Sequence, residues 1–389
     1  MGTDHEVDVA SPHRAMSAAA TDTVSPIRSI ESGHAEFRSR RFFGSLDGLR
    51  ALSVIAVIWH HTAPPHTDDM PTILARGSHG VTLFFAISGF LIVTLLLRER
   101  ERTGRIDLKA FYIRRSLRIF PLYYAVIAVY VLLVFVVERN SAVGREFFNN
   151  LPFFLTYTSN WFVLLEGRVI FYFAWSLAAE EQFYLVWPAV QKFFTPKRAL
   201  GLVAAVIVVV TATQLLSSGG AHAEKGLMHR IVIGVPLAIC FGVVLAHALH
   251  HRRSFDALRW VFASRASAAL WFAALIGSLS WTAAPGVLIH LSAAMFVGAC
   301  VYRENHGLAP LLRLRPIVHV GAVSYGIYLL HMLVKNATVK LASIAHIDLT
   351  TYGPFVVTAV VSVGVASLSF RYFESYFLRL KHRYTAVDR

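Results

Sequence analysis

Cysteine and charged side chains are both scarce in this chain of 389 residues. The two cysteines, Cys240 and Cys300, lie inside apolar stretches, so we expect neither a disulfide framework nor a metal site. Charged residues make up only 15% of the chain, hydrophobic residues make up 56%, and the mean hydropathy is +0.54. These values exclude an ordinary soluble domain and predict an all-α integral membrane protein with several spans.

Acidic residues are outnumbered, because 37 Lys and Arg face 23 Asp and Glu and leave a net charge of +14. A nucleic-acid partner is one interpretation of this excess. In a membrane protein the excess more commonly reflects basic cytoplasmic loops that contact anionic lipid headgroups. We therefore expect membrane lipids as partners and no nucleic acid.

The N-terminal segment lacks the apolar core of a secretory signal. Its scattered Ser, Ala, Thr and His residues predict a disordered cytoplasmic tail over residues 1–43. We expect one membrane domain over residues 44–378 and a short basic cytoplasmic tail over residues 379–389. No loop between them is long enough for an independent soluble domain.

Apolar segments recur along the membrane domain and predict a bundle of about ten transmembrane helices. The predicted spans are 46–63, 80–97, 119–138, 170–193, 199–217, 228–248, 266–283, 285–303, 317–336 and 353–373. No matched pair of broken helices is evident among them, which disfavours a transporter built from inverted repeats.

Residues 150–165 are apolar but short, and Pro152, Ser159 and Asn160 interrupt them. Placing the Lys- and Arg-rich connections on the cytoplasmic side requires an odd number of crossings between residues 138 and 194. We therefore assign 150–165 to a re-entrant or interfacial element. The resulting topology has both termini in the cytoplasm of a multi-pass protein of the plasma (inner) membrane.

The stretch LDGLRALSVIAVIWHHT places Arg50 and His61 at opposite ends of one apolar helix. Eleven residues separate them by about 16 Å along the helix axis. Charged and titratable side chains within a membrane span are costly to bury and indicate a functional site. The spacing suits an enzyme that holds an anionic cofactor near one surface and performs chemistry deeper in the membrane.

A second polar block, FYIRRSLRIFP, carries Arg114, Arg115 and Arg118 where a helix enters the membrane. Arg115 and Arg118 share a helix face, and guanidinium groups at this spacing are suited to binding a phosphate. The alternative is a topology signal that contacts lipid headgroups.

Two further apolar spans carry isolated polar residues. Ser88 and Gly89 permit a close approach, either by a neighbouring helix or by a ligand. Glu180 and Glu181 point about 100° apart, so only one of them is expected to face the interior. A buried glutamate there would either orient an imidazole or pair with an arginine.

A polar face near the C-terminal end combines Ser324, Tyr328 and His331 at helical spacing. Polar side chains at such positions join helices by hydrogen bonds in many membrane proteins. Helix packing and contact with a substrate both remain open for this face.

Together these blocks resemble the membrane acyltransferase-3 family, the O-acyltransferases that modify bacterial surface glycans, lipids and other small substrates. The resemblance covers residues 44–376. The segments that carry it are LDGLRALSVIAVIWHH, GVTLFFAISGFLIVTLLLRE, FYIRRSLRIFPLYY, WSLAAEEQFYLVWP, and VGAVSYGIYLLH followed by FRYFES. The family's arginine–ten residues–histidine motif falls on Arg50 and His61. Its arginine–two residues–arginine motif falls on Arg115 and Arg118, and its Ser-Gly-Phe-Leu element on 88–91.

Two features of this chain differ from the family pattern, and a third concerns which of two adjacent histidines matches the motif. Counting selects His61 over the adjacent His60. The family often carries a histidine two residues before the tryptophan of the WSL block, where this chain has Phe173. Many relatives carry an additional C-terminal hydrolase-like domain. None is evident in this chain, so we expect the membrane part to complete the transfer.

The resemblance implies an O-acyltransferase that uses acyl-CoA, most commonly acetyl-CoA, as a co-substrate and holds no permanent cofactor. The expected donor-binding residues are Arg50, Arg114, Arg115, Arg118, Ser88 and Gly89. His61 would act as general base on an acceptor hydroxyl, and a covalent acyl-histidine is the alternative.

A carboxylate is expected to fix the tautomer of His61, and Glu180, Glu181 and Asp47 are the candidates. Asp47 fits equally well as an ion-pair partner of Arg50 three residues later. The acceptor would be a surface glycan, a lipid-linked sugar or a related small molecule. A proton-coupled transporter or flippase for such precursors is the alternative function.

Overall fold

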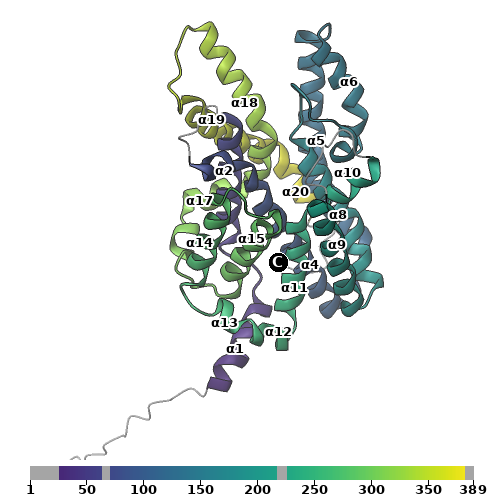
Figure 1. The fold of residues 1–389 in the computed structure, drawn as a ribbon, viewed down its shortest axis with the longest axis vertical. Helices are drawn as coiled ribbons and strands as arrows, with labels where there is room; N and C mark the ends of the chain where they lie inside the picture. The colour runs from purple at the N-terminus through teal and green to yellow at the C-terminus, as the bar shows by residue number, and fades with distance from the viewer. Residues whose placement is uncertain (1–25, 64–70, 217–225, 382–389) are drawn as a thin grey trace, which may run out of the picture.

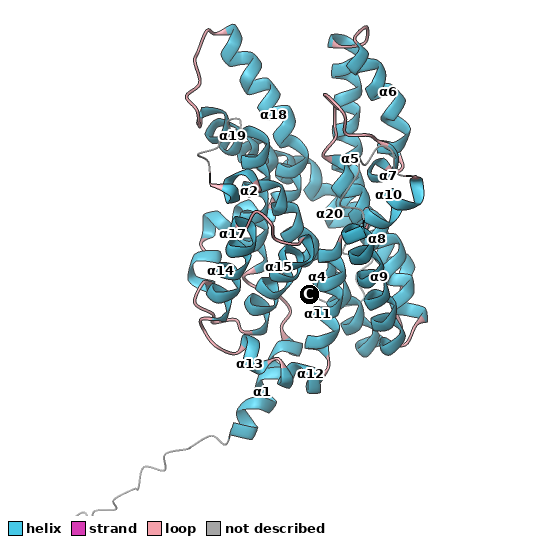
Figure 2. Ribbon diagram, viewed as in Figure 1, coloured by secondary structure: helices cyan, strands magenta, loops and turns pink. Residues whose placement is uncertain are grey.

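The computed structural model describes residues 26–63, 71–216 and 226–381, and the regular structure within them is helical throughout (Figure 2). The helices are α1 (Pro26–Ser39), α2 (Leu46–Thr62), α3 (Thr72–Ala75), η1 (Gly77–His79), α4 (Gly80–Thr103), α5 (Leu108–Val137), α6 (Ala142–Leu155), α7 (Ser159–Phe162), α8 (Ala174–Phe193), α9 (Pro196–Leu216), α10 (Leu227–Ile233), α11 (Leu237–His250), α12 (Arg252–Ala257), α13 (Arg259–Phe262), α14 (Ser267–Ser280), α15 (Gly286–Tyr302), α16 (Ala309–Leu312), α17 (Arg315–Ala322), α18 (Ser324–Ile344), α19 (Gly353–Ser369), η3 (Phe370–Glu374) and α20 (Ser375–Lys381). The predicted all-α class is confirmed.

The centre of the bundle is the contact between α4 and α11, which pack along their lengths (Figure 1). Glycines on both helices allow this close approach. A β-carbon at Gly89 would lie 2.2 Å from the carbonyl oxygen of Ile239, and one at Gly242 would lie 2.5 Å from that of Ala86. Small residues at such a contact permit close backbone packing where the hydrophobic effect contributes little between helices.

Each predicted span coincides with a helix or with two helices separated by a bend. Among the described residues, four helical segments are long and apolar enough to cross a membrane. They are 77–103, 108–137, 196–216 and 353–380. The number rises to six if each of two bent pairs is one span. Helices such as α14, with 14 residues, are only about 21 Å long, so the number of ten spans stays a prediction.

The two bent pairs were absent from the predicted spans, which treated each as one continuous helix. Helices α10 and α11 meet at 43°, and α17 and α18 meet at 76°. Pro236 directly precedes α11, where its ring and missing N–H favour a break. The bend between α17 and α18 orients α18 so that its polar face meets the end of α2.

The predicted disordered tail requires correction for its last part. Residues 26–39 form α1, and residues 1–25 lie outside the described part of the chain. The side chain of Phe37 is 1% exposed and packs against Phe43 and Phe255. One buried aromatic residue such as Phe37 stabilises a segment by burying a large apolar area. It does not create the repeating apolar pattern by which a helix is predicted from sequence.

Residues 150–165, predicted to be re-entrant or interfacial, form the end of α6 and all of α7. The hydroxyl of Tyr123 in α5 donates a hydrogen bond of 2.8 Å to the carbonyl of Phe154 in α6. Figure 1 shows α6 beside the C-terminal half of α5, at the same end of the molecule as α18. The depth of this segment in the bilayer stays a prediction.

The start of α2 packs so tightly against α17 that glycine is required at the contact. A β-carbon at Gly321 would lie 1.8 Å from the carbonyl oxygen of Asp47, which is backbone and has no room to move. We expect Gly321→Ala to destabilise the fold by about 1–3 kcal/mol. Thermal unfolding of the purified protein measures this. Gly364→Ala is the matched control, because a β-carbon there meets open space inside α19, and the change should leave the midpoint unchanged or raise it.

Candidate active site

Two histidines from distant parts of the chain meet where α2 ends. The Nδ1 atom of His61 lies 2.8 Å from Nε2 of His331 in α18. The Nδ1 atom of His331 lies 2.6 Å from the carbonyl oxygen of Tyr328. His331 is fully buried, whereas His61 is half-buried. The rings form a relay that runs from a backbone carbonyl to one partly accessible imidazole.

The hydrogen bonds of this relay determine the tautomer of each neutral ring. A carbonyl oxygen only accepts, so the proton of His331 is on Nδ1 and its Nε2 carries a lone pair. The contact between the rings is then donated by Nδ1–H of His61. His61 consequently presents an unprotonated Nε2, which is the atom that a general base or a nucleophile requires.

His60 is excluded from the relay by its place on the helix. It is exposed, and its ring centroid lies 5.1 Å from that of His61. The choice of His61 by counting therefore agrees with the geometry, since His61 is the histidine that contacts His331.

Aromatic side chains surround the histidine pair. The ring of Tyr172 lies 5.6 Å from that of His61, and the ring of Phe173 lies 5.4 Å from that of His331. Phe173 occupies the position where the family often has a histidine. The carbonyl of Phe173 accepts a hydrogen bond of 3.0 Å from Tyr328 Oη, which fixes the segment before α8 against α18.

The predicted arginines gather at the other end of α2, where α5 begins its passage through the bundle. Arg118 lies within electrostatic range of Arg50 and Arg115, and also of Glu374 in η3. Asp47 accepts a hydrogen bond of 2.5 Å from Arg50, so the alternative in which these two residues pair is confirmed. Neither Arg115 nor Arg118 has an acidic partner within 4 Å in the part of the chain that the structure describes.

Arg115 is held in place by an aromatic ring. Its guanidinium lies 4.0 Å from the centroid of Tyr184, and its Nε has no hydrogen-bond acceptor. Tyr184 Oη donates to the Glu180 carboxylate, and Ser88 Oγ donates to the same oxygen. These contacts join the predicted residues Ser88, Glu180 and Arg115 into one cluster that links α4, α5 and α8.

The expectation that a carboxylate orients His61 requires correction, because Nδ1 of His61 contacts His331 and two of the three candidates bind other side chains. Glu180 accepts from Ser88 and Tyr184, and Asp47 accepts from Arg50. Glu181 lies within electrostatic range of Arg115 and of several tyrosines of the bundle. The orienting partner is an imidazole, His331, which the sequence placed only on a polar helix face.

Two other residues that were predicted to bind the acyl donor contact other helices instead. Gly89 faces the backbone of α11, so the close approach it permits is made by a neighbouring helix. The Nη2 atom of Arg114 lies 3.3 Å from a carboxylate oxygen of Glu99 at the end of α4. The arginine cluster at the end of α2 therefore consists of Arg50, Arg115 and Arg118.

The described residues thus form a helical bundle with a cationic cluster and, about 16 Å further along α2, a histidine relay, both of which indicate a functional site within apolar helices. A family model described as an acyltransferase domain, Acyl_transf_3, matches residues 43–371. The chain belongs to this family.

Several curated proteins are similar to the chain. A peptidoglycan O-acetyltransferase, OatA of Listeria monocytogenes, is 30% identical over 379 residues, which cover 87% of this chain and 56% of that protein. The putative peptidoglycan O-acetyltransferase YrhL of Bacillus subtilis is 27% identical and covers 86% and 54%. The O-acetyltransferase OatA of Staphylococcus aureus is 28% identical and covers 75% and 50%. The chain thus spans about half the length of these relatives, and no solved structure matches it.

Proposed function

We propose that this chain is an integral membrane O-acyltransferase that moves an acetyl group from cytoplasmic acyl-CoA to a hydroxyl of a surface glycan or lipid-linked sugar. The observation that carries the proposal is the hydrogen-bonded relay from the Tyr328 carbonyl through His331 to His61. Such a relay holds one imidazole nitrogen unprotonated and oriented, and general-base catalysis requires both. The relatives that act as O-acetyltransferases support the same class of reaction.

The transfer step follows from the position of the free nitrogen. His61 Nε2 takes the proton of the acceptor hydroxyl while the hydroxyl oxygen forms a bond to the thioester carbonyl carbon. The resulting imidazolium is stabilised because Nδ1–H of His61 already donates to His331. Collapse of the tetrahedral intermediate breaks the carbon–sulfur bond, and the proton on His61 passes to the departing thiolate.

The donor would bind through its phosphates to Arg115 and Arg118. These two guanidinium groups lie close to Arg50, and neither has a carboxylate within 4 Å among the described residues, so both are available to an anionic ligand. Guanidinium groups bind phosphate with paired, charge-assisted hydrogen bonds. Positive charge on this side also favours the proposed cytoplasmic orientation of the cluster and of both termini.

Removing one guanidinium from the cluster should weaken donor binding. We expect Arg118→Gln to raise the KM for acetyl-CoA about tenfold to a hundredfold, because a charge-assisted hydrogen bond of about 1.5–3 kcal/mol is lost. Free thiol release by the purified protein measures the change. Lys109→Gln is the matched control, since it removes one exposed positive charge from the same helix. An equal rise in both variants would instead indicate a general electrostatic effect.

The proposal as a whole is tested by thiol release from acetyl-CoA by the purified protein in detergent or nanodiscs. Acetyl-CoA consumption that requires His61 supports the acyltransferase. A protein that binds no acetyl-CoA and moves protons or sugars across vesicles would instead be the transporter alternative.

A further inference from the structure

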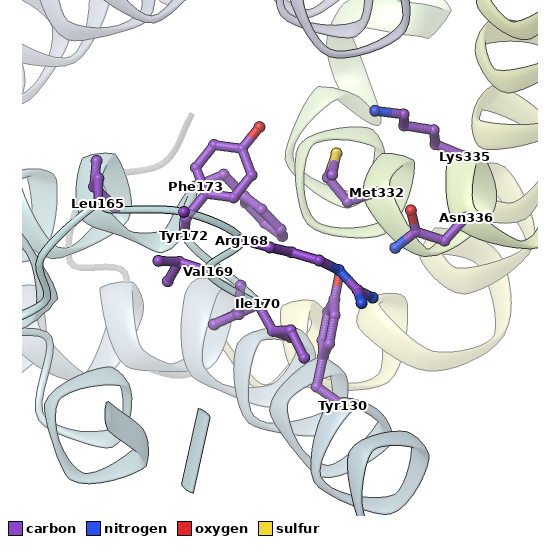
Figure 3. Close-up of a pocket in the computed structure, with 12 residues that line it drawn as sticks. Tyr130, Leu165, Arg168, Val169, Ile170, Tyr172, Phe173, Met332, Lys335 and Asn336 are labelled. Carbon is purple, nitrogen blue, oxygen red and sulfur yellow. The ribbon is translucent and has the colours of Figure 1, made fainter. Parts of the chain in front are cut away.

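A cavity of about 520 Å³ lies beside Tyr172 and Phe173, the two aromatic residues next to the histidine pair (Figure 3). It is partly open and is bordered by α5, by α18 and by the irregular segment that precedes α8. Tyr130 of α5 lines it twelve residues after Arg118, which places it about 18 Å further along the helix. The volume is in the range of sites that hold small molecules.

The cavity shares its walls with the histidine pair. Tyr172 and Phe173 line the cavity, and their rings also contact His61 and His331 respectively. Lys335, a further lining residue, lies one turn after His331 on the same face of α18. It lies within electrostatic range of both histidines of the relay. A molecule in this cavity is therefore next to the proposed base.

The lining combines flat aromatic rings with amide and cationic groups. Figure 3 shows Arg168 extending across the cavity between Tyr130 and Asn336, with Lys335 on the α18 side. Aromatic rings provide apolar faces for the C–H face of a sugar ring, and Asn336 provides donors and an acceptor for hydroxyl groups.

One positive charge of this lining is unneutralised. Arg168 forms an ion pair of 2.8 Å with Glu138, which leaves that side of the cavity close to neutral. Lys335 is half-buried and has no acidic partner within 4 Å among the described residues. A partly desolvated ammonium without a counter-charge favours an anionic group on whatever occupies the cavity.

We infer that this cavity is the acceptor site of the enzyme and that it selects a sugar carrying an anionic group, which Lys335 binds beside His61. The inference rests on the proposed function. The anionic group is either a carboxylate on the sugar itself or the pyrophosphate of a lipid carrier.

The test measures binding directly, so that it does not depend on catalysis. The full chain in nanodiscs is titrated with two soluble probes of equal length. One is the neutral tetramer of N-acetylglucosamine, and the other alternates N-acetylglucosamine with N-acetylmuramic acid and so carries carboxylates. A short polyprenyl pyrophosphate that bears N-acetylglucosamine is the third probe. We expect one of the two anionic probes to bind at least about tenfold more tightly than the neutral one.

Variants of Lys335 test whether this residue causes the tighter binding of the anionic probe. Lys335→Gln should abolish it, and Lys335→Arg should retain it. Asn336→Asp changes an exposed residue of the same cavity and should weaken the anionic probe alone. Equal affinity for all probes, no binding of either anionic probe, or an unchanged preference in Lys335→Gln would overturn the inference. Anionic binding without thiol release would retain the site and contradict the acyltransferase instead.

Discussion

Replacing His61 with alanine should reduce acetyl transfer by about a hundredfold to ten-thousandfold, the usual contribution of a positioned general base. The expected loss is in kcat, because His61 lies about 16 Å from Arg50 along α2, and the proposed site for the donor phosphates is at the arginine end. Thiol release by wild-type and variant protein at equal amounts of folded protein measures the effect. Donor affinity should be unchanged in the same samples.

The adjacent histidine provides the matched control for this substitution. His60 is exposed and does not contact His331 in the relay, so His60→Ala should retain nearly full transfer. If His60→Ala were inactive and His61→Ala active, the assignment of the base would be reversed. Full activity in both variants would remove the histidine pair from the mechanism.

The same proteins distinguish the two chemical routes that a free Nε2 permits. After incubation with radiolabelled acetyl-CoA and no acceptor, covalent label on the wild-type protein that is absent from His61→Ala indicates an acyl-histidine. If the protein carries no label and transfer to an added acceptor still proceeds, the general-base route is indicated.

The second large effect is expected at His331, which touches His61 and acts through it. His331→Leu removes the imidazole nitrogen that accepts the His61 Nδ1–H hydrogen bond and so removes one contact that stabilises the imidazolium. We expect kcat to fall by about a hundredfold, with the KM for acetyl-CoA unchanged. A hydrogen bond to a charged group is worth about 1.5–3 kcal/mol, and loss of orientation adds to this.

A conservative variant separates this positioning role from a packing role. Glutamine at position 331 offers an amide oxygen to His61 and an N–H to the Tyr328 carbonyl, so His331→Gln should recover much of the activity that leucine loses. A packing role predicts the opposite order, because leucine fills a buried apolar site better than glutamine. Equal activity of the two variants with equal stability would contradict the relay.

The sequence predicts the helical class, the family and most of the side chains that form the candidate site. Arg50, His61, Arg115 and Arg118 were identifiable because charged groups in apolar spans are costly and therefore few. Their spacing along single helices also follows directly from the rise per residue. The bends at α10–α11 and α17–α18 were missed because the composition of the spans is apolar on both sides of each break.

The carboxylates illustrate where the local pattern misleads. Glu180 has the chemistry to orient an imidazole, and nothing along the chain indicates that Ser88 of α4 donates a hydrogen bond to it instead. The pairing of Asp47 with Arg50 within α2 was, by contrast, an expected alternative. A side chain's partner depends on which helix lies opposite it. That information belongs to packing between helices that are far apart in sequence.

The sequence by itself determined the membrane class, the placement of charge along each helix and the family, since these depend on composition and on periodicity within one helix. Only the tertiary structure decided that His331 is the partner of His61 and that Lys335 lies beside them in a cavity. The two histidines are 270 positions apart, and the 76° bend before α18 brings them together. Contacts of this kind arise from how separate helices pack and bend, which the periodicity of any single helix does not encode.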